Sequence, residues 1–158
     1  MSIRIGTGYD IHRLVPDRKL ILGGIEVEHE LGLLGHSDAD VLIHAIIDAL
    51  LGAAALGDIG TYFPDTSNEY KDADSAVLLR ETADLLINAG YEIVNIDSSL
   101  ICQKPKLAPY IRRMRQNLAD ILGIDISEIS IKAKTNEKLD SVGRGEAIAA
   151  LTAVLITK

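Results

Sequence analysis

The sequence predicts an α+β fold, a two-layer sandwich in which helices cover one face of a mixed β-sheet. Residues 3–12 alternate in character with the two-residue period of a strand, whereas residues 41–56 form an apolar run of helical length. Expected elements follow in the order strand, strand, helix, helix, strand, helix, strand, strand, which is typical of this class. A chain of 158 residues can bury a real core, and we expect one domain over residues 1–158.

The first expected strand, residues 3–12, directs Asp10 and His12 to the same face. Gly6 and Gly8 share that face and leave space for a ligand or another backbone. A second strand is expected over residues 19–27, broken by Gly23-Gly24.

The helix expected over residues 41–56 is apolar on nearly every face and is therefore buried. His44, Asp48 and Gly52 stand at i, i+4 and i+8, which is one stripe along the helix. Buried ionisable groups need a partner or a metal. Ser37 and Asp40 fit the capping pattern at the start of the helix, and the same free amides can hold a phosphate beside His36.

Residues 57–74 carry turn signals and form a loop long enough to act as a lid. A helix over residues 75–88, a strand over 91–103, a helix from Pro109 to Leu122 and strands over 129–135 and 146–157 complete the prediction. The last strand is so apolar that both of its faces are expected to be buried. Helices on one side would leave the other side of the sheet wet, so we predict a homo-oligomer.

The charge balance narrows the possible partners. Sixteen Lys and Arg against 23 Asp and Glu give a net charge of −7, which argues against nucleic acid and anionic membranes as partners. An anionic small substrate would need local cations. Because Cys102 is the only cysteine, no signal-type segment opens the chain and the 41–56 run is too short to span a bilayer, a cytoplasmic location is expected.

Asp10, His12 and His44 form a candidate metal site. One carboxylate and two imidazoles, with an open fourth position, favour a catalytic zinc site. A salt-bridged strand pair beside a hydrogen-bonded core histidine is the alternative interpretation. Asp48, one turn beyond His44, or else Asp40, one turn before, is expected to accept the other imidazole N–H.

Taken together, the motifs resemble the 2-C-methyl-D-erythritol 2,4-cyclodiphosphate synthase family, at near-constant spacing from about residue 3 to the final strand. The matching segments are Gly8-Tyr9-Asp10-Ile11-His12, Gly35-His36-Ser37-Asp38-Ala39-Asp40 with His44, Ala53 to Gly60, Phe63-Pro64-Asp65-Thr66, Gln103 with Pro105-Lys106, and Gly143-Arg144-Gly145-Glu146.

The resemblance implies that 4-diphosphocytidyl-2-C-methyl-D-erythritol 2-phosphate is closed into the cyclic diphosphate with release of CMP, in the non-mevalonate isoprenoid pathway. It also implies a homotrimer with each site between adjacent subunits. Zn²⁺ is expected on Asp10, His12 and His44, and Mg²⁺ or Mn²⁺ on Glu137. His36 and Thr135 are the expected transition-state stabilisers.

The resemblance also implies which residues bind substrate. Besides Asp10 and His12, the phosphate and methylerythritol contacts are assigned to His36, Ser37, Asp58, Gly60, Phe63, Pro64 and Asp65. The cytidine loop comprises Cys102, Lys104, Pro105, Lys106 and Ala108, with Lys104 or Lys106 meeting phosphate. The diphosphate turn comprises Ala133, Lys134, Thr135, Asn136 and Glu137.

Two departures and two other functions stay open. Lys134 and Asn136 replace threonine and Ser141 replaces an aromatic residue of many relatives, which puts in doubt a prenyl diphosphate cavity on the trimer axis. Arg144 either anchors such a ligand or holds subunits together. A zinc-dependent phosphohydrolase could use the same metal ligands on water, and a non-catalytic isoprenoid-diphosphate binding protein could use the metal as a brace.

Overall fold

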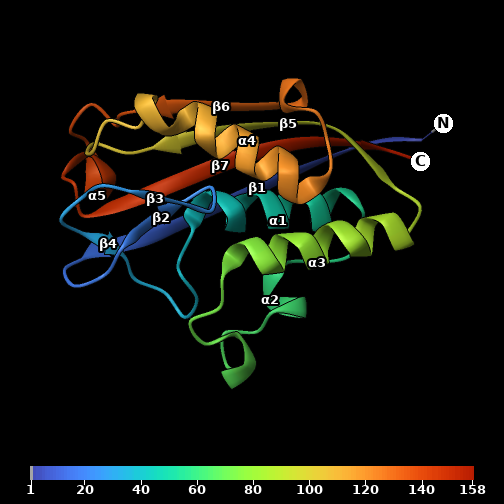
Figure 1. Ribbon diagram of the computed structural model, residues 1–158, viewed down its shortest axis with the longest axis horizontal. Coiled ribbons are helices and arrows are strands. Elements are labelled where there is room, and N and C mark those ends of the chain that lie inside the picture. The colour runs from blue at the N-terminus through green and yellow to red at the C-terminus, as the bar shows by residue number, and fades with distance from the viewer. Residues whose placement is uncertain (1) are drawn as a thin grey trace.

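The computed structural model describes residues 2–158 (Figure 1). The strands are β1 (Ile3–Val15), β2 (Leu20–Leu22), β3 (Ile25–Val27), β4 (Gly32–Leu33), β5 (Glu92–Ile101), β6 (Ile129–Lys134) and β7 (Ala147–Thr157). The α-helices are α1 (Val41–Ala53), α2 (Ile59–Tyr62), α3 (Ser75–Asn88), α4 (Ile111–Leu122) and α5 (Asp140–Gly143). Short 3-10 helices are η1 (Asn68–Tyr70), η2 (Ala108–Tyr110) and η3 (Ile126–Glu128).

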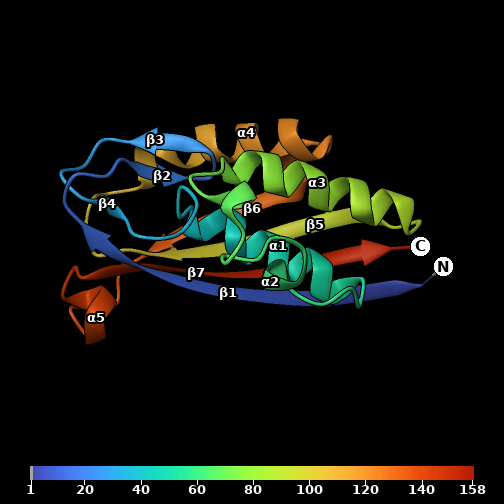
Figure 2. The same cartoon turned by 90° about the horizontal axis from the view of Figure 1, so that it is seen from below.

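The main sheet is mixed, as predicted. Its strand order is β4-β1-β7-β5-β6, and only the β5–β6 pair is parallel. Helices α1, α3 and α4 lie over one face of this sheet, whereas α5 lies at one end on the other side (Figure 2). The α+β class is therefore confirmed, with the single turn of α5 as an exception to helices on one face.

Glycines allow α1 to lie directly on β1. A Cβ on Gly6 would stand 1.9 Å from the Ala49 carbonyl oxygen, and a Cβ on Gly8 would stand 1.9 Å from that of Ala45. No larger side chain fits such a contact, so the space predicted at these glycines is filled by the α1 backbone. The same packing brings the His44 turn of α1 onto the strand that carries Asp10 and His12.

The start of α1 differs from the predicted cap. Asp40, and not Ser37, is the N-cap, since its carboxylate accepts the Ile43 N–H at 3.1 Å. Asp40 also accepts the Gly23 and Gly24 N–H groups at 3.0 and 2.7 Å. These bonds hold a glycine turn, so residues 20–27 form the β2–β3 hairpin where one interrupted strand was predicted.

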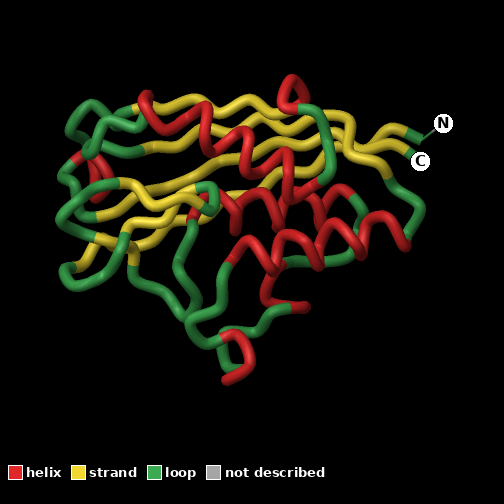
Figure 3. The backbone as a smooth tube through the Cα atoms, viewed as in Figure 1, coloured by secondary structure: helices red, strands yellow, loops and turns green. Residues whose placement is uncertain are grey.

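The segment between α1 and α3 projects from the helix layer (Figure 3). It contains α2 and η1 within the predicted lid, and α3 begins at Ser75 as predicted. Pro109 lies in η2, so α4 starts two residues later than predicted, at Ile111. The sequence did not predict β4 or α5.

The two faces of β7 are buried unequally in the single chain, and the predicted burial of both faces, with another subunit covering the second, stays a prediction. Side chains facing the helices, such as Ile148 and Val154, are buried, whereas Leu151 on the opposite face is 50% exposed. On the neighbouring strand β1, Ile5 is 70% exposed. Only at the α5 end is this face covered, by Val142. Within residues 2–158, no helix is long and apolar enough to cross a membrane.

Candidate active site

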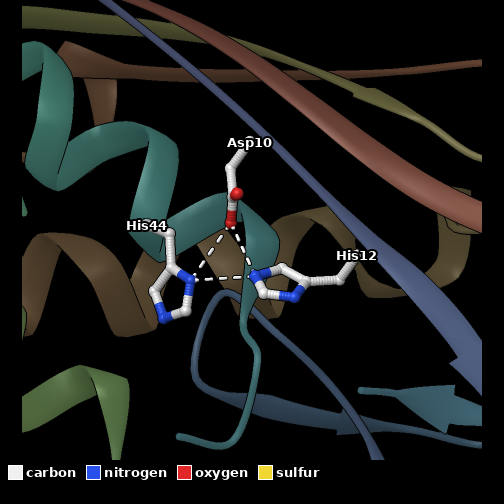
Figure 4. A group of neighbouring side chains, drawn as sticks. All are labelled: Asp10, His12 and His44. Atoms are coloured by element: carbon white, nitrogen blue, oxygen red, sulfur yellow. Dashed lines mark hydrogen bonds and ion pairs between the residues drawn. The ribbon is translucent and has the colours of Figure 1, made fainter. Parts of the chain in front are cut away.

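Three predicted ligand side chains converge between β1 and α1 (Figure 4). Asp10 Oδ2 lies 2.9 Å from His12 Nε2 and 3.1 Å from His44 Nδ1, and the two ring nitrogens are 3.3 Å apart. All three side chains are partly buried. The convergence predicted from strand parity and the helix stripe is confirmed.

Each imidazole is held through its outer nitrogen. His12 Nδ1 lies 2.7 Å from the Leu34 carbonyl oxygen, which can only accept, so this nitrogen carries the proton. His44 Nε2 lies 3.1 Å from Ser37 Oγ and 3.0 Å from Ser75 Oγ. The inner nitrogens can therefore direct lone pairs at the point that Asp10 also faces. Two imidazoles and one carboxylate are a donor set that suits zinc, and the residues fit a metal ion.

Neither predicted carboxylate accepts a hydrogen bond from the His44 imidazole. The Asp48 carboxylate accepts the Ile59 N–H at 2.8 Å, and Asp40 is fully buried against the β2–β3 turn. The hydroxyl oxygens of Ser37 and Ser75 lie beside His44 Nε2 instead. Ser75 was missed because it was interpreted only as a helix start; its distance along the chain from His44 gave no signal.

Contacts within the cluster shift the pKa values of Asp10 and His12. Burial raises the pKa of Asp10, but hydrogen bonds from His12 and His44 outweigh burial and hold that pKa well below its usual range. Burial lowers the pKa of His12, yet the hydrogen bond and charge of Asp10 leave it raised above 6.5. Asp10 is therefore an anion ready to bind a cation, and a proton on His12 competes with metal.

A cavity of about 420 Å³ opens beside the cluster. His36 and Ser37 line it, and His36 Nε2 lies 2.9 Å from the Ser67 carbonyl oxygen. Phe63 lines the lid side and packs edge-on against Tyr70. The lining residues are Asp10, His12, Gly35, His36, Ser37, His44, Ile59, Gly60, Phe63, Pro64, Asp65, Tyr70 and Leu78.

Among the predicted lid residues, Gly60, Phe63, Pro64 and Asp65 reach this cavity, whereas Asp58 does not line it. Asp58 caps α2 by accepting the Thr61 N–H at 2.9 Å. Tyr70 and Leu78 were missed by sequence reasoning, because they come from the end of the lid and from a helix interpreted as structural.

The predicted cytidine and diphosphate residues lie elsewhere, at the ends of β5 and β6 and before β7. None of residues 102–108, 133–137, 141 or 144 lines the metal cavity. Asp10 pairs with Ala150, Ala150 with Leu100, and Leu100 with Ala133. Three strand spacings of about 4.8 Å therefore put roughly 14 Å between Asp10 and the diphosphate turn of the same chain.

This second group is an exposed turn region. Thr135 Oγ1 donates to Glu137 Oε1 at 3.2 Å, and Asn136 Nδ2 donates to Asp140 Oδ2 at 2.6 Å. Glu137 has a φ of 51°, a left-handed conformation that is uncommon for this residue and concentrates at functional sites. Ser141 is the second residue of α5, the short helix that begins at Asp140.

The cytidine loop borders a second cavity, of about 730 Å³. Lys104, Lys138 and Arg144 line it, and Arg144 donates to Glu146 at 2.8 Å. Cys102 is buried, and burial raises the pKa of its thiol to about 11. This thiol is therefore protonated at neutral pH and is no nucleophile.

A mixed sheet covered by helices, with an Asp-His-His cluster opening into a polar cavity, defines the class of α+β enzymes with a three-ligand metal site. Within that class the chain belongs to the YgbB family, whose model matches residues 3–157.

Curated relatives match this chain over nearly the full length of both sequences. The chain is 60% identical over 157 residues to 2-C-methyl-D-erythritol 2,4-cyclodiphosphate synthase of Neisseria gonorrhoeae, covering 99% of this chain and 98% of the relative. It is also 60% identical to the enzyme of the same name from Parabacteroides distasonis, covering 100% and 98%.

Solved structures share the fold. The bifunctional IspDF from Campylobacter jejuni matches with a TM-score of 0.95 and 42% identity over 98% of this chain, which spans 42% of that longer protein. The CDP complex of IspF from Plasmodium falciparum matches with a TM-score of 0.86 and 38% identity, covering 98% of this chain and 96% of that one.

Proposed function

We propose that this chain is a cyclodiphosphate synthase that converts 4-diphosphocytidyl-2-C-methyl-D-erythritol 2-phosphate to 2-C-methyl-D-erythritol 2,4-cyclodiphosphate and CMP. The observation that carries the proposal is the convergence of Asp10, His12 and His44 at a cavity of about 420 Å³. It occurs in a chain 60% identical to enzymes named 2-C-methyl-D-erythritol 2,4-cyclodiphosphate synthase.

The reaction is an intramolecular phosphoryl transfer. An oxygen of the 2-phosphate bonds to the β-phosphorus, and the bond from that phosphorus to the oxygen it shares with the α-phosphorus breaks, so CMP leaves. Because the attacking phosphate is already anionic at neutral pH, no general base is needed. The protein must fold the substrate into line and balance charge, which is positioning and electrostatics.

Asp10, His12 and His44 hold a zinc ion, which supplies a Lewis acid for a phosphate oxygen when bound. His36 and Ser37 contact the phosphate, and the lid residues Gly60, Phe63, Pro64 and Asp65 enclose the methylerythritol end, with Asp58 beside them. The packed Phe63–Tyr70 pair supports this role because it gives the lid side of the cavity an apolar wall.

The nucleotide half of each site comes from a neighbouring subunit of a homotrimer. The separation of roughly 14 Å between Asp10 and the diphosphate turn supports this, since groups that act on the same diphosphate must lie closer together than that. The exposed apolar side chains of Ile5, Tyr9 and Leu151 on the open sheet face give copies a surface to bury.

Within that half, Thr135 and the 102–108 loop contact the diphosphate and cytosine. Glu137 holds a second divalent ion, Mg²⁺ or Mn²⁺, for which an exposed carboxylate is a suitable ligand. The chain forms one domain and acts in the cytoplasm, without nucleic acid or membrane partners.

The test is turnover of the diphosphocytidyl substrate by purified protein, with CMP and the phosphorus products followed by ³¹P NMR and metal content measured in the same sample. Cyclic product that disappears on chelation and returns with zinc and magnesium supports the proposal. A linear phosphate product would instead identify a zinc phosphohydrolase. Binding of prenyl diphosphates without any turnover would identify a binding protein.

A further inference from the structure

The two ring nitrogens of His44 have different surroundings. Nδ1 faces Asp10 Oδ2 at 3.1 Å and His12 Nε2 at 3.3 Å, which is the metal side. Nε2 faces two hydroxyl groups, Ser37 Oγ at 3.1 Å and Ser75 Oγ at 3.0 Å. A neutral imidazole has one proton, so Nδ1 can bind a cation only if Nε2 carries that proton and donates it to a hydroxyl oxygen.

Asp38 determines which hydroxyl can accept. Three donors converge on its carboxylate: Ser75 Oγ at 2.5 Å, the Ser75 N–H at 3.1 Å and the Asp40 N–H at 3.1 Å. The hydroxyl proton of Ser75 is thereby committed to Asp38, and its oxygen lone pairs face His44. Ser75 is fully buried, so water does not compete for these bonds.

Ser37 is placed differently. Its Oγ accepts the Ala39 N–H at 3.2 Å, and Ser37 lines the cavity, whereas neither Asp38 nor Ser75 does. The Ser37 hydroxyl proton is thus available to a ligand in the cavity. Helix α3 also has its own cap, because Asp74 accepts the Ala76 N–H at 2.9 Å. Capping of α3 therefore does not account for the contact between Asp38 and the Ser75 hydroxyl.

We propose that Asp38 and Ser75 are a positioning pair that orients the His44 ring and accepts its Nε2 proton, so that Nδ1 can bind metal. The pair acts through His44 and touches no substrate. This inference rests on the proposed function, because it assumes that His44 is a metal ligand. It assigns a role to Asp38, in the loop before α1, and to Ser75, the first residue of α3, which lie 37 positions apart.

Asp38→Asn gives the sharpest test. An amide oxygen is a weaker acceptor than a carboxylate, and its NH₂ group would oppose the Ser75 N–H, so the Ser75 hydroxyl proton is held less firmly and can turn toward His44 Nε2. Metal affinity, measured with Zn²⁺ or Co²⁺ against a competing chelator, is expected to fall about 10- to 100-fold. Imidazole ¹⁵N NMR of the zinc-loaded protein is expected to show a weaker hydrogen bond from His44 Nε2 in the variant than in wild type.

Ser75→Ala and Ser37→Ala form a matched pair, because each removes one hydroxyl at the same distance from Nε2. Ser75→Ala is expected to lower metal affinity and Ser37→Ala to retain it. Ser75→Ala also serves if Asp38→Asn does not fold. Unfolding of each metal-free variant separates loss of stability from loss of metal affinity.

Wild-type metal affinity and an unchanged His44 Nε2 signal in both Asp38→Asn and Ser75→Ala would overturn the inference. Equal losses in Ser75→Ala and Ser37→Ala would also overturn it, because Asp38 would then not distinguish the two hydroxyl groups. Failure of the proposed function is distinguishable, since it would appear as missing cyclic product from the wild-type protein, whereas the metal affinities of these variants would still test the pair. Metal binding that depends on His44 but not on Asp38 would reject the positioning pair alone.

Discussion

The Asp10–His12–His44 cluster and the diphosphate turn at residues 133–137 are both small groups of polar side chains, but one chain holds them very differently. The cluster lies on a long strand and a buried helix, and every ring nitrogen has a partner. The turn is largely exposed and its hydrogen bonds are mostly local. The difference supports the proposal that a single chain completes the metal end, which is the Asp10–His12–His44 cluster, whereas a neighbouring subunit completes the nucleotide end, which is the diphosphate turn.

The largest expected effects come from removing one group at each end. His44→Ala should abolish metal binding and lower turnover about a thousandfold, the equivalent of about 4 kcal/mol of charge stabilisation. Glu137→Gln should lower turnover about a hundredfold and leave the zinc content unchanged, since Glu137 lies outside the cluster. CMP release and metal analysis on both variants measure this contrast.

Mixing the two variants tests whether the ends belong to different chains. In every trimer that contains both His44→Ala and Glu137→Gln chains, one of the three sites would combine an intact metal end with an intact turn. Activity of doubly tagged trimers should therefore recover to roughly that fraction of wild type. A mixture no more active than its parents would show that each chain supplies both ends, and the comparison would fail.

The sequence predicted the metal end well because its information is local. Strand parity places Asp10 and His12 on one side, and the i, i+4, i+8 stripe gives α1 one polar face. Gly6 and Gly8 correctly indicated a close approach. The partner of His44 was predicted wrongly, because Asp48 instead accepts an amide from Ile59 in the loop after the helix.

Other differences arose where distant contacts decide the structure. Gly23-Gly24 became a hairpin turn because Asp40 binds both amides, and no local pattern reports that contact. The apolar character of β7 predicted two buried faces, but Leu151 is half exposed in one chain. The resemblance named the residues of the nucleotide end; nothing in their spacing could place them at the far edge of the sheet.

The residues around the two ends should also differ in how much they contribute to the stability of the fold. Asp40 is the N-cap of α1, the helix that carries His44 of the metal end. Asp40→Ala leaves three N–H groups without their acceptor, each costing about 1–3 kcal/mol. Burial raises the pKa of Asp40 to about 6, so removing its charge offsets part of that loss. The free energy of unfolding at neutral pH should fall by about 3 kcal/mol.

Arg144→Ala is the change to compare with Asp40→Ala, because Arg144 follows α5, the short helix next after the diphosphate turn. It breaks an exposed pair with Glu146, and exposed ion pairs contribute little. Urea denaturation should not resolve this variant from wild type. If Arg144→Ala destabilised the monomer as much as Asp40→Ala, the nucleotide end would be as firmly built as the metal end.

A graded effect is expected from the pH dependence of the metal end. Because Asp10 leaves the pKa of His12 raised above 6.5, metal must displace a proton from His12 at pH values below that raised pKa. Each zinc ion that binds at pH values below the His12 pKa must release one proton from His12. This release alone should weaken zinc affinity about tenfold for each pH unit below that pKa.

The stability of the metal-free protein should change in the opposite direction. The contribution of the raised His12 pKa is fully present below about pH 6.5 and is lost as the pH rises through the folded value. That of Asp10 is present above about pH 4 and is lost as its lowered pKa is approached. Chelator competition and thermal unfolding across this range measure both, and His12→Asn removes the His12 contribution to each. An affinity that stayed constant with pH would mean that His12 binds no proton in the metal-free site.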